Sequence, residues 1–234
     1  MLNLRSNILS PLAHLFYPHI CTGCGSDLVE EDNLLCLQCV NDLPHTNFAM
    51  HAGNPVEKIF WGRLPLTAAM SEFYFTKGTL IQTLIHEFKY KGNTDMGLYL
   101  GAMMGSSLLS NNRFTKIDLM VPLPLFADKE FKRGYNQATI LCNGISEVTD
   151  IPVIKNNVVR KRYTETQTKK HRTERWENVE SSFEVSNPKE IAGKHILLVD
   201  DVVTTGATLE ACGAEILKAE GTMLSIATLA YASK

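Results

Sequence analysis

The chain has 234 residues, of which 44% are hydrophobic, so it is long enough to bury a sizeable core in one or two domains. Its formal net charge of −2 gives no overall reason to expect a nucleic-acid partner. The longest apolar runs fall far short of the roughly 18 residues that a membrane-spanning helix needs, so we expect no membrane span.

The N-terminal stretch, MLNLRSNILSPLAHLFYPHIC, carries few charges. Pro11 and His14 interrupt its apolar part, and no clean small-residue cleavage site follows, so we do not expect a signal peptide and predict a cytoplasmic protein. The spacing of the apolar residues predicts a short amphipathic helix instead. These residues are Ile8, Leu9, Leu12, Leu15 and Phe16.

Four of the six cysteines form two C-x2-C pairs, which are Cys21 with Cys24 and Cys36 with Cys39. Two such turns bring four thiolates around one tetrahedral ion, and Zn²⁺ binding would stabilise a segment that has too few apolar residues for a core of its own. Disulfides and a redox C-x-x-C motif are the alternatives. The lack of an export signal disfavours the first, and the presence of two matching pairs disfavours the second. We therefore predict a structural zinc ribbon.

The pattern after the cysteines predicts a second, larger unit. Residues 51–65 have mixed polarity and are typical of a linker, and strand and helix patterns alternate from residue 66 onward. We therefore divide the chain into residues 1–50 (N-terminal helix and zinc ribbon), 51–65 (linker) and 66–234. Strands are expected at Ala68–Phe75, Ile117–Pro122, His195–Val199 and Met223–Ala230, and helices near residues 80–89, 98–109, 135–148 and 207–219.

The expected strands are apolar on both faces and are separated by helices. This pattern is typical of an α/β fold in which helices cover both faces of a parallel sheet. Two shorter strands, at Val158–Val159 and Phe183–Val185, would flank a long polar loop. The remaining cysteines, Cys142 and Cys212, lie in helical patterns and are expected to pack as small apolar groups.

Two adjacent acids, Asp200 and Asp201, end one apolar strand, and the loop Thr204–Thr208 (TTGAT) leads from them into a helix. Ligands of an open parallel sheet bind beyond the carboxyl ends of its strands, and the amides and dipole of a helix N-terminus favour an anion. Gly206 allows close backbone approach, and the threonines add hydroxyl donors. The two carboxylates would accept hydrogen bonds from ribose hydroxyls, so a ribose phosphate fits. The alternative is that Thr204 or Thr205 only caps the helix and the acids are solvated.

The stretch ILLVDDVVTTGATL (residues 196–209) resembles the phosphoribosyl pyrophosphate signature of type I phosphoribosyltransferases. Other stretches resemble the ComF family, which includes ComFC and GntX relatives: LIHEFKYKGN (84–93), VPLPLFADKEFKRGYNQA (121–138), RKRYTETQTKKHRTERWENVESSF (160–183) and the four-cysteine segment that ends in Leu43-Pro44. The resemblance covers most of the chain. It implies a type I phosphoribosyltransferase-like parallel sheet flanked by helices, and an association with DNA uptake in natural transformation.

By this resemblance, Asp200 and Asp201 would hold the ribose hydroxyls, and Asp201 would be a candidate general base. The 5′-phosphate would bind Thr204, Thr205, Gly206, Ala207 and Thr208. Arg133 and Gly134 match the loop that grips pyrophosphate, with a solvated helix start as the alternative interpretation.

A long basic loop between Val159 and Phe183 matches the mobile hairpin that closes over the diphosphate in related enzymes, and Arg172 is its candidate ligand. A flexible, solvated charge run is the alternative. Lys89 and Lys91 also match the family, and would either supply cations near the phosphates or complement a helix C-terminus.

Two functions follow from these patterns. The first is transfer at the anomeric carbon of phosphoribosyl pyrophosphate or a related ribose 5-phosphate, with Mg²⁺ bridging the diphosphate and the ribose hydroxyls, and with an acceptor that the sequence does not identify. The second is a non-enzymatic module that binds single-stranded DNA or a DNA helicase through the basic loop and the zinc ribbon.

Overall fold

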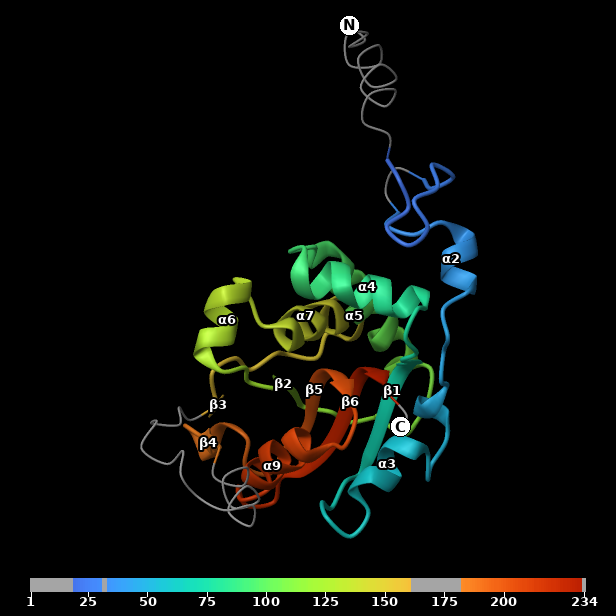
Figure 1. Ribbon diagram of the computed structural model, residues 1–234. Helices are drawn as coiled ribbons and strands as arrows, with labels where there is room; N and C mark the ends of the chain where they lie inside the picture. The colour runs from blue at the N-terminus through green and yellow to red at the C-terminus, as the bar shows by residue number, and fades with distance from the viewer. Residues whose placement is uncertain (1–18, 31–32, 161–181, 233–234) are drawn as a thin grey trace, which may run out of the picture.

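The computed structural model describes residues 19–30, 33–160 and 182–232 (Figure 1). The N-terminal helix predicted from Ile8 to Phe16, and Arg172 with most of the basic loop, lie outside these ranges.

A four-stranded sheet in the order β1-β6-β5-β2 forms the centre of the molecule, and all its neighbouring strands are parallel. The strands are β1 (Ala68–Tyr74), β2 (Leu119–Pro122), β5 (His195–Val203) and β6 (Met223–Tyr231). Their inner residues are almost entirely buried, as the apolar runs in the sequence predict. The predicted α/β class is confirmed.

Helices cover both faces of this sheet (Figure 1). One face carries α4 (Leu80–Tyr90), α5 (Thr94–Leu109) and α7 (Gln137–Thr149), and the other carries α3 (Pro55–Phe60) and α9 (Ala207–Ile216). The backbones of α5 and α7 approach closely, because a Cβ built on Gly144 would lie 2.2 Å from the Leu98 carbonyl oxygen. Cys142 and Cys212 are buried in this packing, as expected for small apolar groups.

Two further strands, β3 (Val158–Arg160) and β4 (Phe183–Val185), form an antiparallel pair beside the main sheet. They confirm the two short strands that the sequence places on either side of the long polar loop. A short 3₁₀ helix, η3 (Pro188–Glu190), leads from β4 toward β5.

The structure differs from the sequence prediction in three places. Strand β5 continues through both acids to Val203, because its ladder with β6 pairs Asp200 with Thr228 and Val202 with Ala230. A helix, α6 (Ala127–Arg133), occupies a stretch that the sequence suggests is a loop; none of its residues is buried, so it carries no apolar periodicity.

The third difference concerns residues 51–65, for which the sequence predicts a linker. They contain α3, whose Val56 and Phe60 are buried in the same core as the sheet. Asn54 begins this helix, and its side-chain oxygen accepts hydrogen bonds from two amides of the first turn. The predicted domain boundaries themselves stay predictions.

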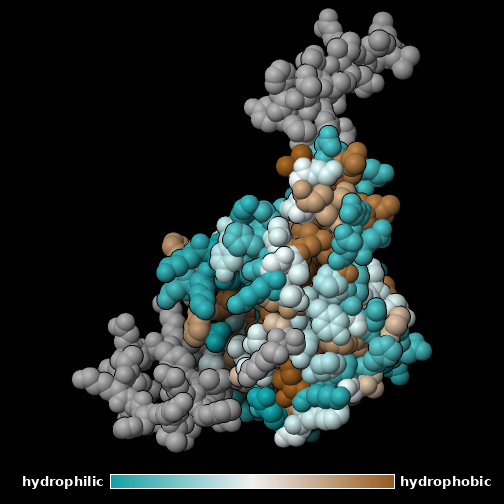
Figure 2. Space-filling model, turned by 45° about the vertical axis from the view of Figure 1, so that its right-hand side comes forward, coloured by the Kyte–Doolittle hydropathy of each residue, from teal (hydrophilic) through white to brown (hydrophobic). Residues whose placement is uncertain are grey.

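The cysteine-bearing segment precedes this core and continues into α2 (Leu37–Asn41) and the 3₁₀ helix η1 (Phe48–Met50). Most of the face shown in Figure 2 is hydrophilic, and apolar residues gather toward the cysteine-bearing end. Among the described residues, no helix combines the length and the apolar character that crossing a membrane requires.

Candidate functional site

The two acids lie at the carboxyl end of β5, where the backbone N–H of Asp201 donates a hydrogen bond to Asp200 Oδ1 at 2.8 Å. Successive strand residues point to opposite faces of a sheet. Accordingly, Asp201 pairs with Lys89 of α4 on one face, whereas the electrostatic neighbours of Asp200 include Cys212 of α9 on the other. The side chains of the two acids therefore point toward different faces of the sheet.

Lys89 compensates one of the two negative charges. Its Nζ atom lies 2.6 Å from Asp201 Oδ2, and the two side chains are only 17% and 16% exposed. From the sequence, Lys89 would either supply a cation near the phosphates or complement a helix C-terminus. In the structure it lies at the acidic pair. Lys91 is not brought there, because it is mostly exposed and pairs with Glu87 one turn back on α4.

Burial raises the pKa of Asp200, and the negative charge of Asp201 raises it further, to about 8. The amide of Asp201 and the cations Lys89 and Arg160 act in the opposite direction but do not cancel these effects. Asp200 therefore holds a proton over much of the neutral range, and the acidic pair then carries a single negative charge.

The loop after β5 surrounds a small hollow of about 50 Å³. Water occupies roughly 30 Å³ per molecule in the liquid, so the hollow suits one compact group such as a phosphate. Asp200 and all five residues of Thr204–Thr208 line it, so one acid and the loop share a single hollow. Asp201 is not among the lining residues, and it faces Lys89 instead.

Gly206 makes the turn from this loop into α9. Its φ of +73° is left-handed, and a Cβ built there would lie 2.6 Å from the Ile59 side chain. Gly206 is also the N-cap of α9, and in the described part of the chain no side chain caps this helix. The interpretation of Thr204 or Thr205 as a simple helix cap is therefore wrong, and the first amides of α9 remain available to a ligand.

Arg133 and Gly134 lie at the end of α6, where Gly134 takes a left-handed φ of +82° and ends the helix. The Arg133 guanidinium donates a hydrogen bond to Gln137 Oε1 at 2.8 Å and lies over the Tyr90 ring at 5.5 Å. Arg133 is thus held beside the end of α4, where it lies over Tyr90, the residue that follows Lys89 in the chain. The interpretation of Arg133 as a solvated helix start is wrong, because it is the last residue of a helix.

Two residues are candidates that the sequence patterns did not single out. Gln137 is 2% exposed, and its Nε2 atom has no hydrogen-bond partner among the described residues. A glutamine at the first position of a helix, three residues after Gly134, is the signal that could have drawn attention to it. Arg160 ends β3, and its guanidinium lies 3.8 Å from the centre of the Phe126 ring. Its charge favours the ionised form of Asp200.

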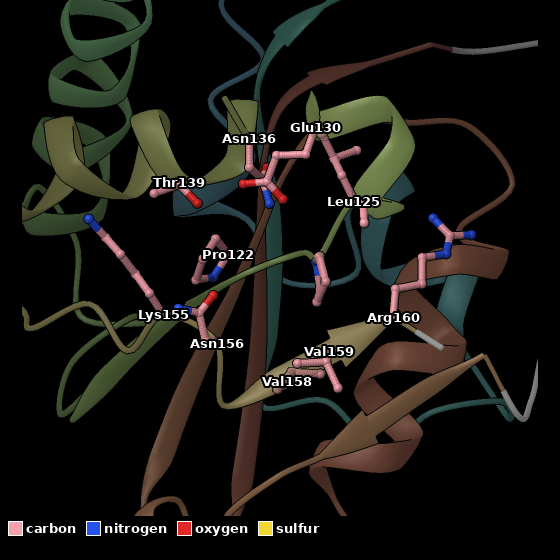
Figure 3. A pocket seen from close by; sticks show the side chains of 12 residues that line it. Pro122, Leu125, Glu130, Asn136, Thr139, Lys155, Asn156, Val158, Val159 and Arg160 are labelled. Atoms are coloured by element: carbon pink, nitrogen blue, oxygen red, sulfur yellow. The ribbon is translucent and has the colours of Figure 1, made fainter. Parts of the chain in front are cut away.

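A second hollow, of about 200 Å³, lies beyond the end of β2 (Figure 3). The side chains of Lys155 and Arg160 lie on opposite sides of it, and Glu130 of α6 lies between them in the view of Figure 3. Arg160 therefore borders this hollow and also acts electrostatically on Asp200 of the smaller one.

The four predicted metal ligands come together in the structure. The sulfur atoms of Cys21, Cys24, Cys36 and Cys39 all lie within 4.8 Å of one another. Cys24 Sγ and Cys36 Sγ are 3.7 Å apart, which fits the separation of about 3.8 Å between two thiolates on a tetrahedral Zn²⁺ with bonds of about 2.3 Å.

Backbone donors support this cluster. Burial alone would raise the pKa of Cys21, but hydrogen bonds from the amides of Cys36, Cys24 and Gly23 outweigh it and lower the pKa to about 6. Gly23 also allows close packing, because a Cβ there would lie 2.7 Å from Leu80 Cδ1 and 2.9 Å from Cys39 Sγ. The cysteine turn is therefore seated against the start of α4.

Comparison with known proteins identifies a domain in this chain and several relatives. The model of the phosphoribosyl transferase domain matches residues 132–234, a range that contains Arg133, the acidic pair and the loop Thr204–Thr208. The DNA utilization protein YhgH of Escherichia coli (strain K12) is 30% identical over 194 residues, which cover 81% of this chain and 80% of that protein.

Two competence proteins are also similar. Competence protein F of Haemophilus influenzae is 27% identical over 201 residues and covers 84% of this chain and 83% of its own length. Competence protein ComFC of Bacillus subtilis is 32% identical over 137 residues, which cover 58% of this chain and 52% of that protein.

The raised pKa of Asp200 predicts a specific dependence of stability on pH. Between about pH 4 and about pH 8 the folded chain keeps a proton that the unfolded chain has lost, so the free energy of unfolding falls as the pH rises through this window. Asp200→Asn has no such proton to lose. We expect this variant to be more stable than the wild type at about pH 8 by at least about 1 kcal/mol, the equivalent of one pKa unit.

Urea unfolding at several pH values between about pH 5 and about pH 8 measures this effect. The exposed Asp95 at the start of α5 gives a matched control, since Asp95→Asn makes the same change of side chain at an exposed position away from the acidic pair. Wild-type stability that does not fall with pH relative to Asp200→Asn would contradict the assignment.

Proposed function

Because the chain belongs to the ComF family and has a phosphoribosyl transferase domain at residues 132–234, we propose that it binds phosphoribosyl pyrophosphate, or a related ribose 5-phosphate, at the end of β5. One observation carries the proposal. Asp200 and the whole of Thr204–Thr208 line a single small hollow at the N-terminus of α9. A carboxylate that accepts from hydroxyls and a cradle of amide donors are the two features that a phosphorylated sugar needs.

Each part of the ligand has a proposed partner. The 5′-phosphate binds the amides and hydroxyls of Thr204–Thr208. The ribose hydroxyls donate to Asp200 and Asp201, and Lys89 holds the Asp201 side chain in place through their ion pair. Arg133 and the turn at Gly134 bind the diphosphate.

The supported reaction is transfer at the anomeric carbon. The bond from this carbon to the diphosphate oxygen breaks, the electron pair leaves with the pyrophosphate, and an acceptor forms the new bond to the same carbon. Mg²⁺, when bound with the diphosphate and the ribose hydroxyls, would neutralise charge on the leaving group. The protein's own contribution is mainly orientation and charge stabilisation.

Of the two acids, Asp200 is the better candidate to exchange a proton with the acceptor. An acid–base group works best when its pKa lies near the working pH, and the pKa of Asp200 is raised to about 8. The ionised fraction of Asp200, which grows as the pH approaches 8, is the form that would accept the proton. Asp201 is paired with Lys89 at 2.6 Å, so we assign it to binding rather than to proton transfer. The sequence alone pointed to Asp201 for this role.

The names of the relatives connect the family with competence and DNA utilization, and we propose a role of this protein in the uptake or use of DNA. One structural observation favours direct contact with single-stranded DNA as a second candidate function. The rings of Phe131 and Tyr90 are 90% and 65% exposed, and Lys132 and Arg133 lie beside them on α6. Exposed rings between cations offer both base stacking and phosphate contact.

We also propose that the four-cysteine cluster holds one structural Zn²⁺. Four converging thiols leave no open coordination position, so the ion would stabilise the fold rather than take part in catalysis.

The sugar-phosphate proposal predicts saturable binding. Isothermal titration with phosphoribosyl pyrophosphate and Mg²⁺, and with ribose 5-phosphate, should give heat for the wild type. Asp200→Asn with Asp201→Asn should weaken binding about 10- to 100-fold, as expected when hydrogen bonds to charged groups are lost. Lys218→Gln breaks an exposed ion pair with Glu215 far along α9 and should have no effect. No binding by the wild type of either ligand rejects the proposal.

The DNA candidate predicts a different pattern. Fluorescence anisotropy with an oligothymidine strand should show binding that weakens steeply with salt. Phe131→Ala should weaken it about tenfold, since one stacked base contributes about 1–3 kcal/mol. Met223 is another exposed apolar residue, and Met223→Ala serves as the control. Equal affinity of the two variants, or binding indifferent to salt, would exclude a stacking surface at α6.

The zinc proposal predicts about one metal ion per chain in purified protein. Cys39→Ser should lose the metal and destabilise the segment, whereas Cys212→Ala, on the buried side of α9, should keep it. Metal-free protein with four freely titratable thiols in the cluster would overturn the assignment.

A further inference from the structure

Helix α3 packs directly against the phosphate loop, although it precedes the loop by more than 140 residues. Gly206 has no room for a side chain, since a Cβ there would lie 2.6 Å from Ile59 Cγ2 and 2.8 Å from Phe60 Cε1. Phe60 itself is almost completely buried. The last turn of α3 thus forms one wall of the loop.

Arg63, just after this helix, joins three elements. Its Nη1 donates to the carbonyl oxygen of Ile59 at 3.1 Å and to that of Thr205 at 3.4 Å. Its Nε donates to Glu210 Oε1 at 3.1 Å, and its Nη2 pairs with Glu210 Oε2. One guanidinium therefore connects the end of α3, the phosphate loop and the first turn of α9, in the two-point geometry that only arginine provides.

Helix α3, from which Arg63 extends, is itself held in place by side-chain hydrogen bonds. The Asn54 side-chain amide donates to the carbonyl oxygens of Phe48, His51 and Ala69. Glu57 accepts from the amide of Ala69 and pairs with Arg113. Because these bonds tie α3 to β1, Arg63 holds the loop against a part of the molecule that is rigidly joined to the sheet.

The bond to Thr205 has a geometric consequence. In a planar trans peptide the C=O and the following N–H point in opposite directions. When Arg63 holds the Thr205 carbonyl on the α3 side, the N–H of Gly206 must point away from α3. The hollow lies within this loop, and Thr205 and Gly206 both line it.

We infer that Arg63 is a positioning residue for phosphate binding, because it orients the Thr205–Gly206 peptide so that the loop presents its amides to an anion. The inference rests on the proposed function of the hollow. Arg63 acts through geometry rather than charge, since Glu210 neutralises its guanidinium. It also lies outside residues 132–234, so the phosphate site of this chain extends beyond the matched domain.

Hydrogen exchange of the ligand-free protein tests the orientation first. In Arg63→Gln, the amides of residues 204–210 should exchange at least about tenfold faster than in the wild type, because the loop loses its tie to α3. Arg63→Lys keeps the positive charge but lacks the planar guanidinium that bonds two groups at once, so it should not restore the protection of these amides from exchange. Lys218→Gln, which breaks the pair with Glu215 later in α9, is the matched control and should leave the loop unchanged.

Ligand titration then separates positioning from general damage. Arg63→Gln should bind ribose 5-phosphate about tenfold more weakly but bind Mg²⁺-pyrophosphate as the wild type does, because pyrophosphate contacts the turn at Gly134. Glu210→Gln retains the bond from Arg63 to Thr205 and should lose less affinity than Arg63→Gln.

The outcomes distinguish a failure of the inference about Arg63 from a failure of the proposed sugar-phosphate function. Unchanged exchange in Arg63→Gln overturns the inference whatever the ligand data show, and an equal loss of affinity for both ligands assigns Arg63 a purely structural role. A wild type that binds no ribose 5-phosphate rejects the proposed function and, with it, the phosphate-binding part of the inference. The exchange data would then still decide whether Arg63 orders the loop.

Discussion

Two like charges at the end of a buried strand set the main constraint on this molecule. Asp200 and Asp201 repel each other, and their burial makes the repulsion stronger than it would be in water. Cations from two separate elements offset part of this repulsion. Lys89 of α4 forms an ion pair with Asp201, and the charge of Arg160 of β3 favours the ionised form of Asp200. Even so, the pKa of Asp200 stays high, so the pair remains an unfavourable arrangement in the free protein. A site that lowers stability in this way is what a ligand-binding role requires.

Much of the fold was predictable because strong periodic signals decided it. The four apolar strand patterns predict a buried parallel sheet. The apolar run of the third pattern ends at Asp200, which indicates the carboxyl end of a strand, where ligands bind. The C-x2-C spacing predicted the clustering of four thiols, which the structure shows within 4.8 Å. For the site, the sequence placed Asp200 beside Thr204–Thr208 because all of them belong to one short stretch.

The rest of the site was hidden because it depends on contacts between distant segments. Helix α3 has only six residues and a mixed composition, so its short apolar side resembles a linker. The bond from Arg63 to Thr205 joins residues 142 positions apart, and no local pattern signals it. The same holds for the choice between Lys89 and Lys91, which have similar sequence contexts. Only packing shows that the first reaches Asp201 and the second reaches Glu87.

The shapes of the two proposed binding surfaces bear on how the two candidate functions relate. The hollow at Thr204–Thr208 has about 50 Å³ and lies at the N-terminus of α9, so it suits one terminal phosphate group better than a continuous nucleic-acid backbone. Phe131 on α6 is freely accessible and is followed by Lys132 and Arg133, which suits stacked bases, and it has no feature that would select a monophosphate. Arg133, at the end of α6, belongs to both surfaces, since it lies over Tyr90 and precedes the turn at Gly134. A strand bound along α6 would therefore engage the residue proposed to hold the diphosphate. The two ligands would compete for one guanidinium, although each has its own principal site.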